Sequence, residues 1–286
     1  MPRRPLKVFN LPNMPAALLR VVHIANDESA TAEELADAIM LDPSLATRIL
    51  RIANSAYFGR LKKVDTITEA VVALGFNCIR NLATTAYIID AVFPEERFPT
   101  FSWRHLWVHS VACATCTELI YTAITLYPYT SDECAFLAGL LHDVGKMVIA
   151  LAAPHKFNEI LEVCPDYGFD MFNAEYSILR TDHAEVGELL TAEWGLPPTI
   201  SKAIGWHHTP KAAKEFQDLA RAVSAGNLLA KRLTKSPFVG HVPSVSVQDV
   251  AEISRLSISK IHHITNLVRA KMQTLTDIIS WAEVRL

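Results

Sequence analysis

Apolar residues recur every three to four positions along most of the 286-residue chain, and runs that alternate between apolar and polar residues are scarce. Only ten glycines interrupt this pattern. The spacing is that of helices rather than strands, so it predicts an all-α protein. Helices are predicted over residues 103–126, 132–142, 154–164, 171–180, 182–194, 197–207 and 216–233, with a further helical segment at 247–282.

Helix start signals support this prediction in the N-terminal part of the chain. Thr31 and Glu34 have the spacing of a capping box, in which each side chain accepts a hydrogen bond from the backbone of the other residue. Pro43 follows Asp42 and would occupy the first turn of another helix, where its missing N–H is tolerated. Apolar residues at helical spacing predict one more short helix within 67–75.

The segment FPEERFP, residues 93–99, resembles a linker and divides the chain. We expect an N-terminal helical subdomain at 11–98, a second helical bundle at 99–232 and a C-terminal helical extension at 233–286. The clustered histidines all lie in the second region.

Composition narrows the class of protein. Half of the residues are apolar and a fifth are charged, which is typical of a soluble globular protein. A formal net charge of −3, and helix pairs without a basic recognition face, argue against nucleic acid as a partner. We see no signal peptide, and no run that approaches the roughly 18 apolar residues of a membrane span. The five cysteines, including the Cys113–Cys116 pair, are interpreted as reduced packing residues. We therefore expect a cytoplasmic protein without a membrane partner.

The segment AGLLHDVGKMVIAL, residues 138–151, places titratable residues inside an apolar run. Burial of an unpaired charge is costly, so His142 and Asp143 require a metal ion, a hydrogen-bond network or an exposed helix end. Lys146 follows His142 by about one turn and could complete an ion network or bind a phosphoryl group.

Other histidines lie at predicted helix ends. His105 and His109 share one helix face, His183 opens a helix, and His207 and His208 close the next one. Imidazole and carboxylate groups are ligands of zinc, iron and manganese, and a carboxylate can bridge two ions that activate water for attack on phosphorus. The alternative is structural, because a histidine at a helix C-terminus also interacts favourably with the helix dipole.

The motif LLHDVGK resembles the signature of the HD superfamily of metal-dependent phosphohydrolases. The segments LPNMPAALLRVV, IMLDPSLATRILRIANSAYFG, ITEAVVALGFNCIRNLA, WVHSVACA and HAEVGELLTAEWGLPPTISKAIGWHH are more similar to one branch, the HDOD domain, over residues 11–232. This resemblance implies an HD-type helical bundle with an N-terminal helical subdomain. It also implies a bacterial signalling module, usually without hydrolase activity, that acts through a protein partner on a separate chain and could bind a metal ion or a nucleotide.

The resemblance also implies a site for one or two ions of iron, manganese or zinc. The implied metal ligands are His109, His142, Asp143, His183, His207 and His208, with His105 and Asn227 as weaker candidates. His105 stands where the HD-GYP branch commonly has a glutamate, and Asn227 where the superfamily's last aspartate is expected. In an active phosphohydrolase or phosphodiesterase, Asp143 would bridge the ions and Lys146 would contact the phosphate. The Thr-Pro-Lys run after His208 departs from the Gly-Tyr-Pro run of HD-GYP enzymes, so we favour the non-catalytic module and keep the enzyme as the alternative.

Overall fold

The computed structural model describes residues 16–25, 27, 29–54, 63–76, 78–80, 83, 98, 101–125, 132–166, 171–234 and 245–274. Every regular element within these residues is a helix, and none is a strand, so the predicted all-α class is confirmed. The chain forms two compact units. The small unit comprises residues 13–93 and 270–286, and the large unit comprises residues 1–12 and 94–269.

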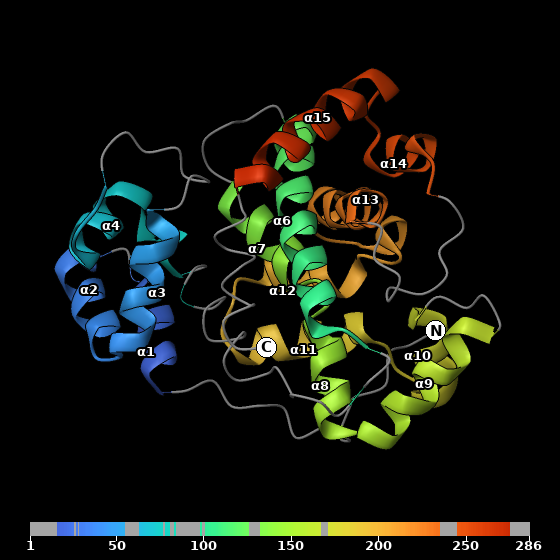
Figure 1. Cartoon of the computed structure of the whole chain (residues 1–286), viewed down its shortest axis with the longest axis horizontal. Helices are drawn as coiled ribbons and strands as arrows, with labels where there is room; N and C mark the ends of the chain where they lie inside the picture. The colour runs from blue at the N-terminus through green and yellow to red at the C-terminus, as the bar shows by residue number, and fades with distance from the viewer. Residues whose placement is uncertain are drawn as a thin grey trace. The chain divides into compact units, whose positions relative to one another are not determined.

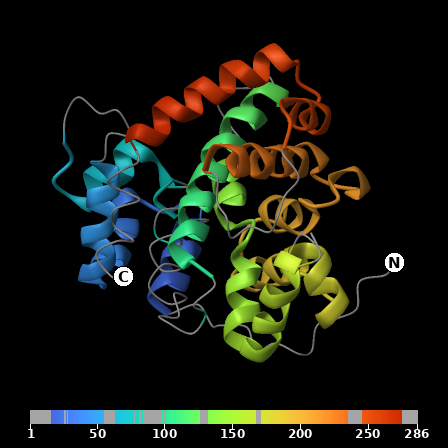
Figure 2. The ribbon, with the colours of Figure 1, turned by 45° about the vertical axis from the view of Figure 1, so that its right-hand side comes forward.

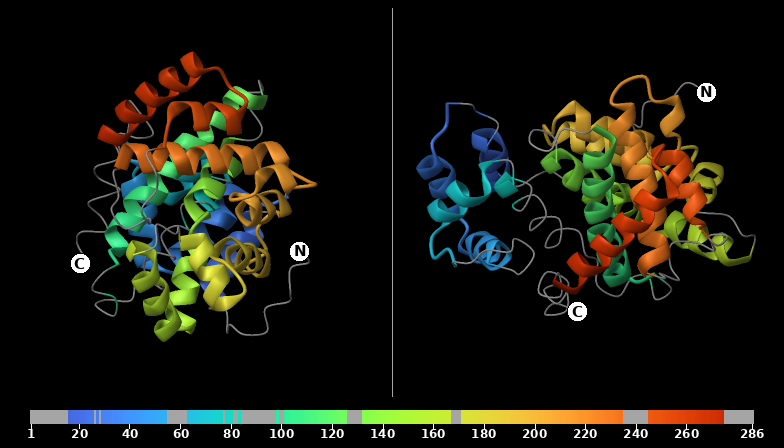
Figure 3. Two further views of the ribbon diagram at one scale, coloured as in Figure 1. Left: turned by 90° about the vertical axis from the view of Figure 1, so that its right-hand side faces the viewer. Right: turned by 90° about the horizontal axis from the view of Figure 1, so that it is seen from above.

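The small unit contains the helices α1 (Ala16–Ala25), α2 (Ala32–Met40), α3 (Pro43–Ala53) and α4 (Ile67–Leu74). Helix α2 packs against the other three, which Figure 3 shows as one group of short helices. The predicted capping box is confirmed at the start of α2. Glu34 N–H donates to Thr31 Oγ1 at 3.2 Å, and Thr31 N–H donates to Glu34 Oε2 at 2.8 Å.

The large unit carries the remaining helices. They are α6 (Trp103–Thr125), α7 (Asp132–Leu141), α8 (Val144–Ala152), α9 (Pro154–Asp166), α10 (Met171–Leu179), α11 (His183–Glu193), α12 (Pro198–Trp206), the 3₁₀ turn η2 (Pro210–Ala212), α13 (Gln217–Thr234), α14 (Val247–Ser254) and α15 (Ile258–Thr274), whose last residues belong to the small unit. Helix α6 lies against α7 and α13, and α11 lies against α8 and α12 (Figures 1 and 2).

Two glycines allow the close approach of the helices around α6. A Cβ atom on Gly139 of α7 would lie 2.8 Å from the Cα of Ala114, and one on Gly226 of α13 would lie 3.0 Å from the backbone nitrogen of Thr117. The first distance is shorter than real Cβ contacts and the second is tighter than nine in ten of them, so a larger residue would push these helices apart. Cys113 and Cys116 are buried on the same helix and form no disulfide within the described residues, which agrees with a packing role.

The structure adds detail that the pattern did not predict. Helix α8 follows the His–Asp pair directly, and the predicted C-terminal helical segment is two helices in its described part. These helices are separated at Arg255, whose φ of 60° is left-handed. The predicted linker 93–99 lies, except for Phe98, outside the described residues, and the predicted domain boundaries stay predictions.

One sequence expectation needs correction. Within the described residues, Cys134–Ala152 is long and apolar enough on average to cross a membrane, although we expected no run of that length. The segment includes most of α7, the His142–Asp143 turn and α8, and 83% of its most apolar window is buried inside the structure. A buried pair of core helices has the same composition as a membrane span, which explains the difference.

Candidate metal centre

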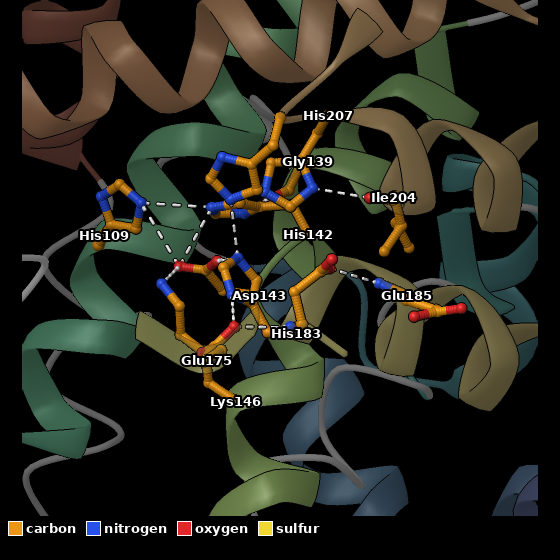
Figure 4. A network of polar contacts seen from close by, with 12 residues as sticks. His109, Gly139, His142, Asp143, Lys146, Glu175, His183, Glu185, Ile204 and His207 are labelled. Carbon is orange, nitrogen blue, oxygen red and sulfur yellow. Dashed lines mark hydrogen bonds and ion pairs between the residues drawn. The ribbon is translucent and has the colours of Figure 1, made fainter. Parts of the chain in front are cut away.

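The ligand-type residues predicted from the sequence converge in the large unit. They come from the first half of α6 (His109), the turn between α7 and α8 (His142 and Asp143), the start of α11 (His183) and the residues after α12 (His207 and His208). Figure 4 shows most of these side chains pointing toward one another. All of them are buried except His208, which is half-buried.

The first group of potential metal ligands consists of His109, His142 and Asp143, with one ligand atom from each residue within 4.8 Å of the others. The Nε2 atoms of His109 and His142 lie 3.3 Å apart. Asp143 Oδ2 lies 3.3 Å from His142 Nε2 and 3.9 Å from His109 Nε2. The geometry therefore directs two imidazoles and a carboxylate oxygen at one point.

His183, His207 and His208 form a second such group within the described residues. His208 Nε2 lies 2.9 Å from His183 Nε2. The other oxygen of Asp143, Oδ1, lies 3.2 Å from His183 Nε2. Asp143 thus stands between the two groups and presents one oxygen to each.

The hydrogen bonds of three imidazole rings determine which nitrogen faces the centre. His142 Nδ1 lies 2.8 Å from the Gly139 carbonyl, and His207 Nδ1 lies 2.7 Å from the Ile204 carbonyl. His183 Nδ1 lies 2.6 Å from Glu175 Oε2. Carbonyl and carboxylate oxygens only accept hydrogen bonds, so Nδ1 is the donor in each ring. In a neutral ring, Nε2 then carries the lone pair, which is the form that binds metal.

Two buried acceptor atoms test whether a cation fits this site. Asp143 Oδ1 and His207 Nε2 are buried and make no hydrogen bond with any described residue. The lone pair of a neutral His183 ring would also face Asp143 Oδ1 at 3.2 Å, which is unfavourable without a proton or a metal ion between them. Burial alone would lower the pKa of His183, but Glu175 and Asp143 together raise it, so the ring can carry that proton when no metal is bound. Imidazole nitrogens and a carboxylate are suitable ligands for zinc, iron or manganese, so the residues fit a divalent metal ion.

Burial and neighbouring charges shift the pKa values of these groups in different directions. Burial lowers the pKa of His109, His207 and His208 well below the ordinary 6.5, so these rings are neutral at pH 7. Burial also opposes protonation of His142, but the charge of Asp143, its hydrogen bond and the neighbouring Cys113 together outweigh burial and raise the pKa of His142 to about 10. Without metal, protonated His142 partly neutralises the buried carboxylate.

Lys146 is the second positive partner of Asp143. Its Nζ lies 2.7 Å from Asp143 Oδ2, and the side chain is only 4% exposed. The pKa of Asp143 is well below its usual value, because His142 and Lys146 together outweigh the effect of burial. The predicted neighbourhood of the His–Asp pair and the lysine is therefore present in the structure, although their chemical roles stay predictions.

The two weaker candidates lie in different surroundings. His105 is half-buried one turn before His109 and belongs to neither group of potential ligands among the described residues. Asn227 is buried on α13, and its Oδ1 makes no hydrogen bond within the described part of the chain. Lys231, one turn after Asn227, contributes to the lowered pKa values of His109 and His208, so this face of α13 lies near the site.

Some residues around the centre were not predicted from the sequence. Glu175 accepts hydrogen bonds from His183, and Phe172 stacks on His208 with ring centroids 4.3 Å apart. Both lie on α10, and folding of the chain brings this helix against the two histidines. The spacing of residues along the sequence therefore could not identify them. Lys231 could have been found, because it follows Asn227 by four residues on one helix.

Comparisons with known proteins agree with this architecture. A family model, the HDOD domain, matches residues 11–210. An uncharacterized protein of Treponema pallidum is 25% identical over 234 residues, which are 79% of this chain. The chain spans only 43% of that relative's length.

Two solved structures cover nearly the whole chain. A protein of Shewanella amazonensis named "Putative phosphohydrolase" is 26% identical, with a TM-score of 0.74 and coverage of 93% of this chain and 94% of that one. An HDOD domain protein of unknown function from Geobacter sulfurreducens is also 26% identical, with a TM-score of 0.73 and coverage of 96% and 93%. The fold therefore agrees with the resemblance seen in the sequence.

Proposed function

The chain belongs to the HDOD domain family, and we propose that it is a metal-binding signalling module that acts through contacts with a separate protein chain. The observation that carries the proposal is the convergence of imidazole Nε2 atoms on the buried carboxylate of Asp143. Such a site links the positions of several helices to the presence of a cation.

Each of the two groups would hold one ion of iron, manganese or zinc. His109 and His142 would bind one ion, His183, His207 and His208 would bind the other, and Asp143 would bridge them. A bound divalent ion would neutralise the buried carboxylate and, in an active enzyme, would lower the pKa of a water molecule.

Metal binding would be coupled to the arrangement of the helices. The ligands lie on α6, on the turn between α7 and α8, at the start of α11 and after α12, so an ion joins segments that are distant in the sequence. Without the ion, Lys146 and the proton on His142 neutralise Asp143 instead. The two states differ in their local contacts, and a partner that contacts these helices could distinguish them.

Two observations favour signalling over hydrolysis. The amide of Asn227 stands where the resemblance places a carboxylate ligand, and an amide carries no charge to hold a second ion or to orient water. The ligand side chains are also buried, with only His208 half-buried, whereas a phosphoryl substrate must reach the ions directly.

A metal-dependent phosphohydrolase is the second candidate. The position of Lys146 favours it, because the ammonium group lies 2.7 Å from Asp143 Oδ2 and could stabilise phosphoryl oxygens once cations neutralise Asp143. The Shewanella amazonensis protein that is 26% identical carries the name "Putative phosphohydrolase".

Elemental analysis of the untagged protein, purified without oxygen, tests the proposal. We expect one or two equivalents of iron, manganese or zinc in the wild type and loss of the metal in a His142→Ala, Asp143→Ala variant. A His262→Ala, His263→Ala variant is the matched control, because both histidines are exposed on α15 and should not affect the metal content. Less than a tenth of an equivalent in all three proteins would contradict metal binding.

Assays of the metal-loaded protein separate the two candidates. Hydrolysis of bis(p-nitrophenyl) phosphate that is present in the wild type and the control but lost in the His142→Ala, Asp143→Ala variant would favour the enzyme. Metal binding without hydrolysis would favour the signalling module.

A further inference from the structure

Glu175 is a buried carboxylate on α10 beside the candidate metal centre, and its side chain is 0% exposed. Its Oε2 accepts hydrogen bonds from His183 Nδ1 at 2.6 Å and from the His183 backbone N–H at 2.7 Å. Figure 4 shows the two side chains in contact. Glu175 therefore determines the position of both the ring and the main chain of His183.

The type of acceptor distinguishes His183 from the neighbouring histidines. The Nδ1 atoms of His142 and His207 donate to the backbone carbonyls of Gly139 and Ile204. A carboxylate carries a full negative charge, whereas a carbonyl carries only a dipole. Glu175 therefore polarises the His183 ring more strongly than the carbonyls polarise the other two rings. This makes the Nε2 lone pair of His183 a better donor to a cation.

A structural role alone does not explain a charged group at this position. Burial of a carboxylate is costly, and Glu175 Oε1 makes no hydrogen bond within the described residues. Helix α11 already has a cap, because Asp182 Oδ1 accepts a hydrogen bond from Glu185 N–H at 2.9 Å. A neutral acceptor could bond the His183 backbone N–H without the cost of burying a charge.

We propose that Glu175 is a positioning residue for the metal ion held by His183, His207 and His208, an inference that rests on the proposed metal binding. Glu175 acts through His183. Its hydrogen bond keeps the proton on Nδ1 and the lone pair on Nε2, and its negative charge strengthens the binding of a divalent cation. The ion bound by His109 and His142 receives no such support from it.

The variant Glu175→Gln tests the charge, because glutamine keeps an oxygen that can accept both hydrogen bonds. We expect the affinity for the ion at the His183 group to fall about 10- to 100-fold, while the other ion is retained. Competition with a chelator, combined with metal analysis, measures the two affinities. Glu159→Gln is the matched control, because this glutamate on α9 is 49% exposed and pairs with Lys156. The control should bind both ions as the wild type does.

A second readout uses the metal-free wild type and does not depend on the variant. The ¹⁵N chemical shifts of the His183 ring report which of its nitrogens carry a proton. We expect a proton on Nδ1, and an Nδ1 without a proton would overturn the proposal.

The outcomes distinguish the two levels of inference. Equal affinities in the wild type and Glu175→Gln would overturn the role of Glu175 and leave metal binding intact. Loss of both ions together with a large loss of stability would show that Glu175 is structural. A wild type without metal would contradict the proposed function itself, and with it this inference.

Discussion

Gly145, at the start of α8, lies against the main chain of His183, at the start of α11. A Cβ atom on Gly145 would contact the His183 carbonyl oxygen and would lie 2.8 Å from its carbonyl carbon and 2.9 Å from the backbone nitrogen of Gly187. These atoms belong to backbone, which cannot move aside as a flexible side chain can. Because Gly145 has no side chain, α8 can approach α11 closely enough for Asp143 and His183 to lie next to one another.

Gly145→Ala is expected to separate α8 from α11. We expect a loss of roughly 1–3 kcal/mol in the free energy of unfolding, as for other overpacked cores, together with loss of metal from the His183 group. Urea denaturation and metal analysis measure the two effects. Gly195→Ala is the comparison, because Gly195 has a φ of 70° but no atom within 4 Å of an added Cβ. The free energy of unfolding of Gly195→Ala should fall by about 1 kcal/mol, and this variant should keep its metal. Equal metal content in both variants would contradict the prediction.

Two lysine–carboxylate pairs of the same length lie in different surroundings. Lys146–Asp143 and Lys156–Glu159 both join residues three apart at 2.7 Å, but the first pair is buried and the second is about half exposed. In the metal-free protein, Lys146→Met should lower the free energy of unfolding by about 3 kcal/mol, because Asp143 loses its nearest cation. Lys156→Met should change it by less than about 1 kcal/mol. Bound metal should reduce the loss of unfolding free energy that Lys146→Met causes. An equal loss with and without metal would show that the ion does not neutralise Asp143.

Asn227→Asp would place a carboxylate at the position where the resemblance to the HD superfamily predicts its last aspartate. We expect metal affinity to rise by about tenfold and the metal-free protein to lose stability, because the new carboxylate is buried. Asn266→Asp, on the exposed face of α15, is the control and should alter neither quantity. Unchanged affinity in Asn227→Asp would show that this side chain lies outside the reach of the ions.

Removal of the metal should destabilise the large unit. A ligand present at one hundred times its Kd contributes about 2.7 kcal/mol to stability, and each kcal/mol shifts the Tm of a domain of this size by about 2–4 °C. Differential scanning calorimetry with and without a chelator measures the shift. The His142→Ala, Asp143→Ala variant should show no shift, and a similar shift in both proteins would mean that the chelator acts elsewhere.

Local signals were sufficient to predict much of the fold. The capping box of Thr31 and Glu34 and the helices α6, α7 and α11 agree with the predicted ranges within a few residues. Such features depend on neighbours in the sequence. The break at Arg255 was harder to predict, because a left-handed residue at a helix end is usually glycine or asparagine. Helix α8 was missed because it is a short and mostly apolar segment whose residues 144–150 are all buried, and such a segment cannot be assigned to a helix or a strand from its pattern alone.

The candidate site could be predicted only in part. The histidines and Asp143 are chemically conspicuous, so their residue types and helix-end positions sufficed to select them. Glu175 resembles any surface glutamate in the sequence, and only the packing of α10 shows that it is buried against His183. The close contact at Gly145 likewise depends on how α8 and α11 meet, which no local pattern contains.

The position of Asp143 between the two groups has a consequence for how the protein would respond to metal. Each carboxylate oxygen faces a different group, so two ions would share one negative charge. The first ion withdraws electron density from that carboxylate and repels the second, so the two would bind with unequal affinities. As the metal concentration rises, the centre would bind its first ion in one concentration range and its second ion in a higher one. The protein would then respond to metal in two steps rather than in one.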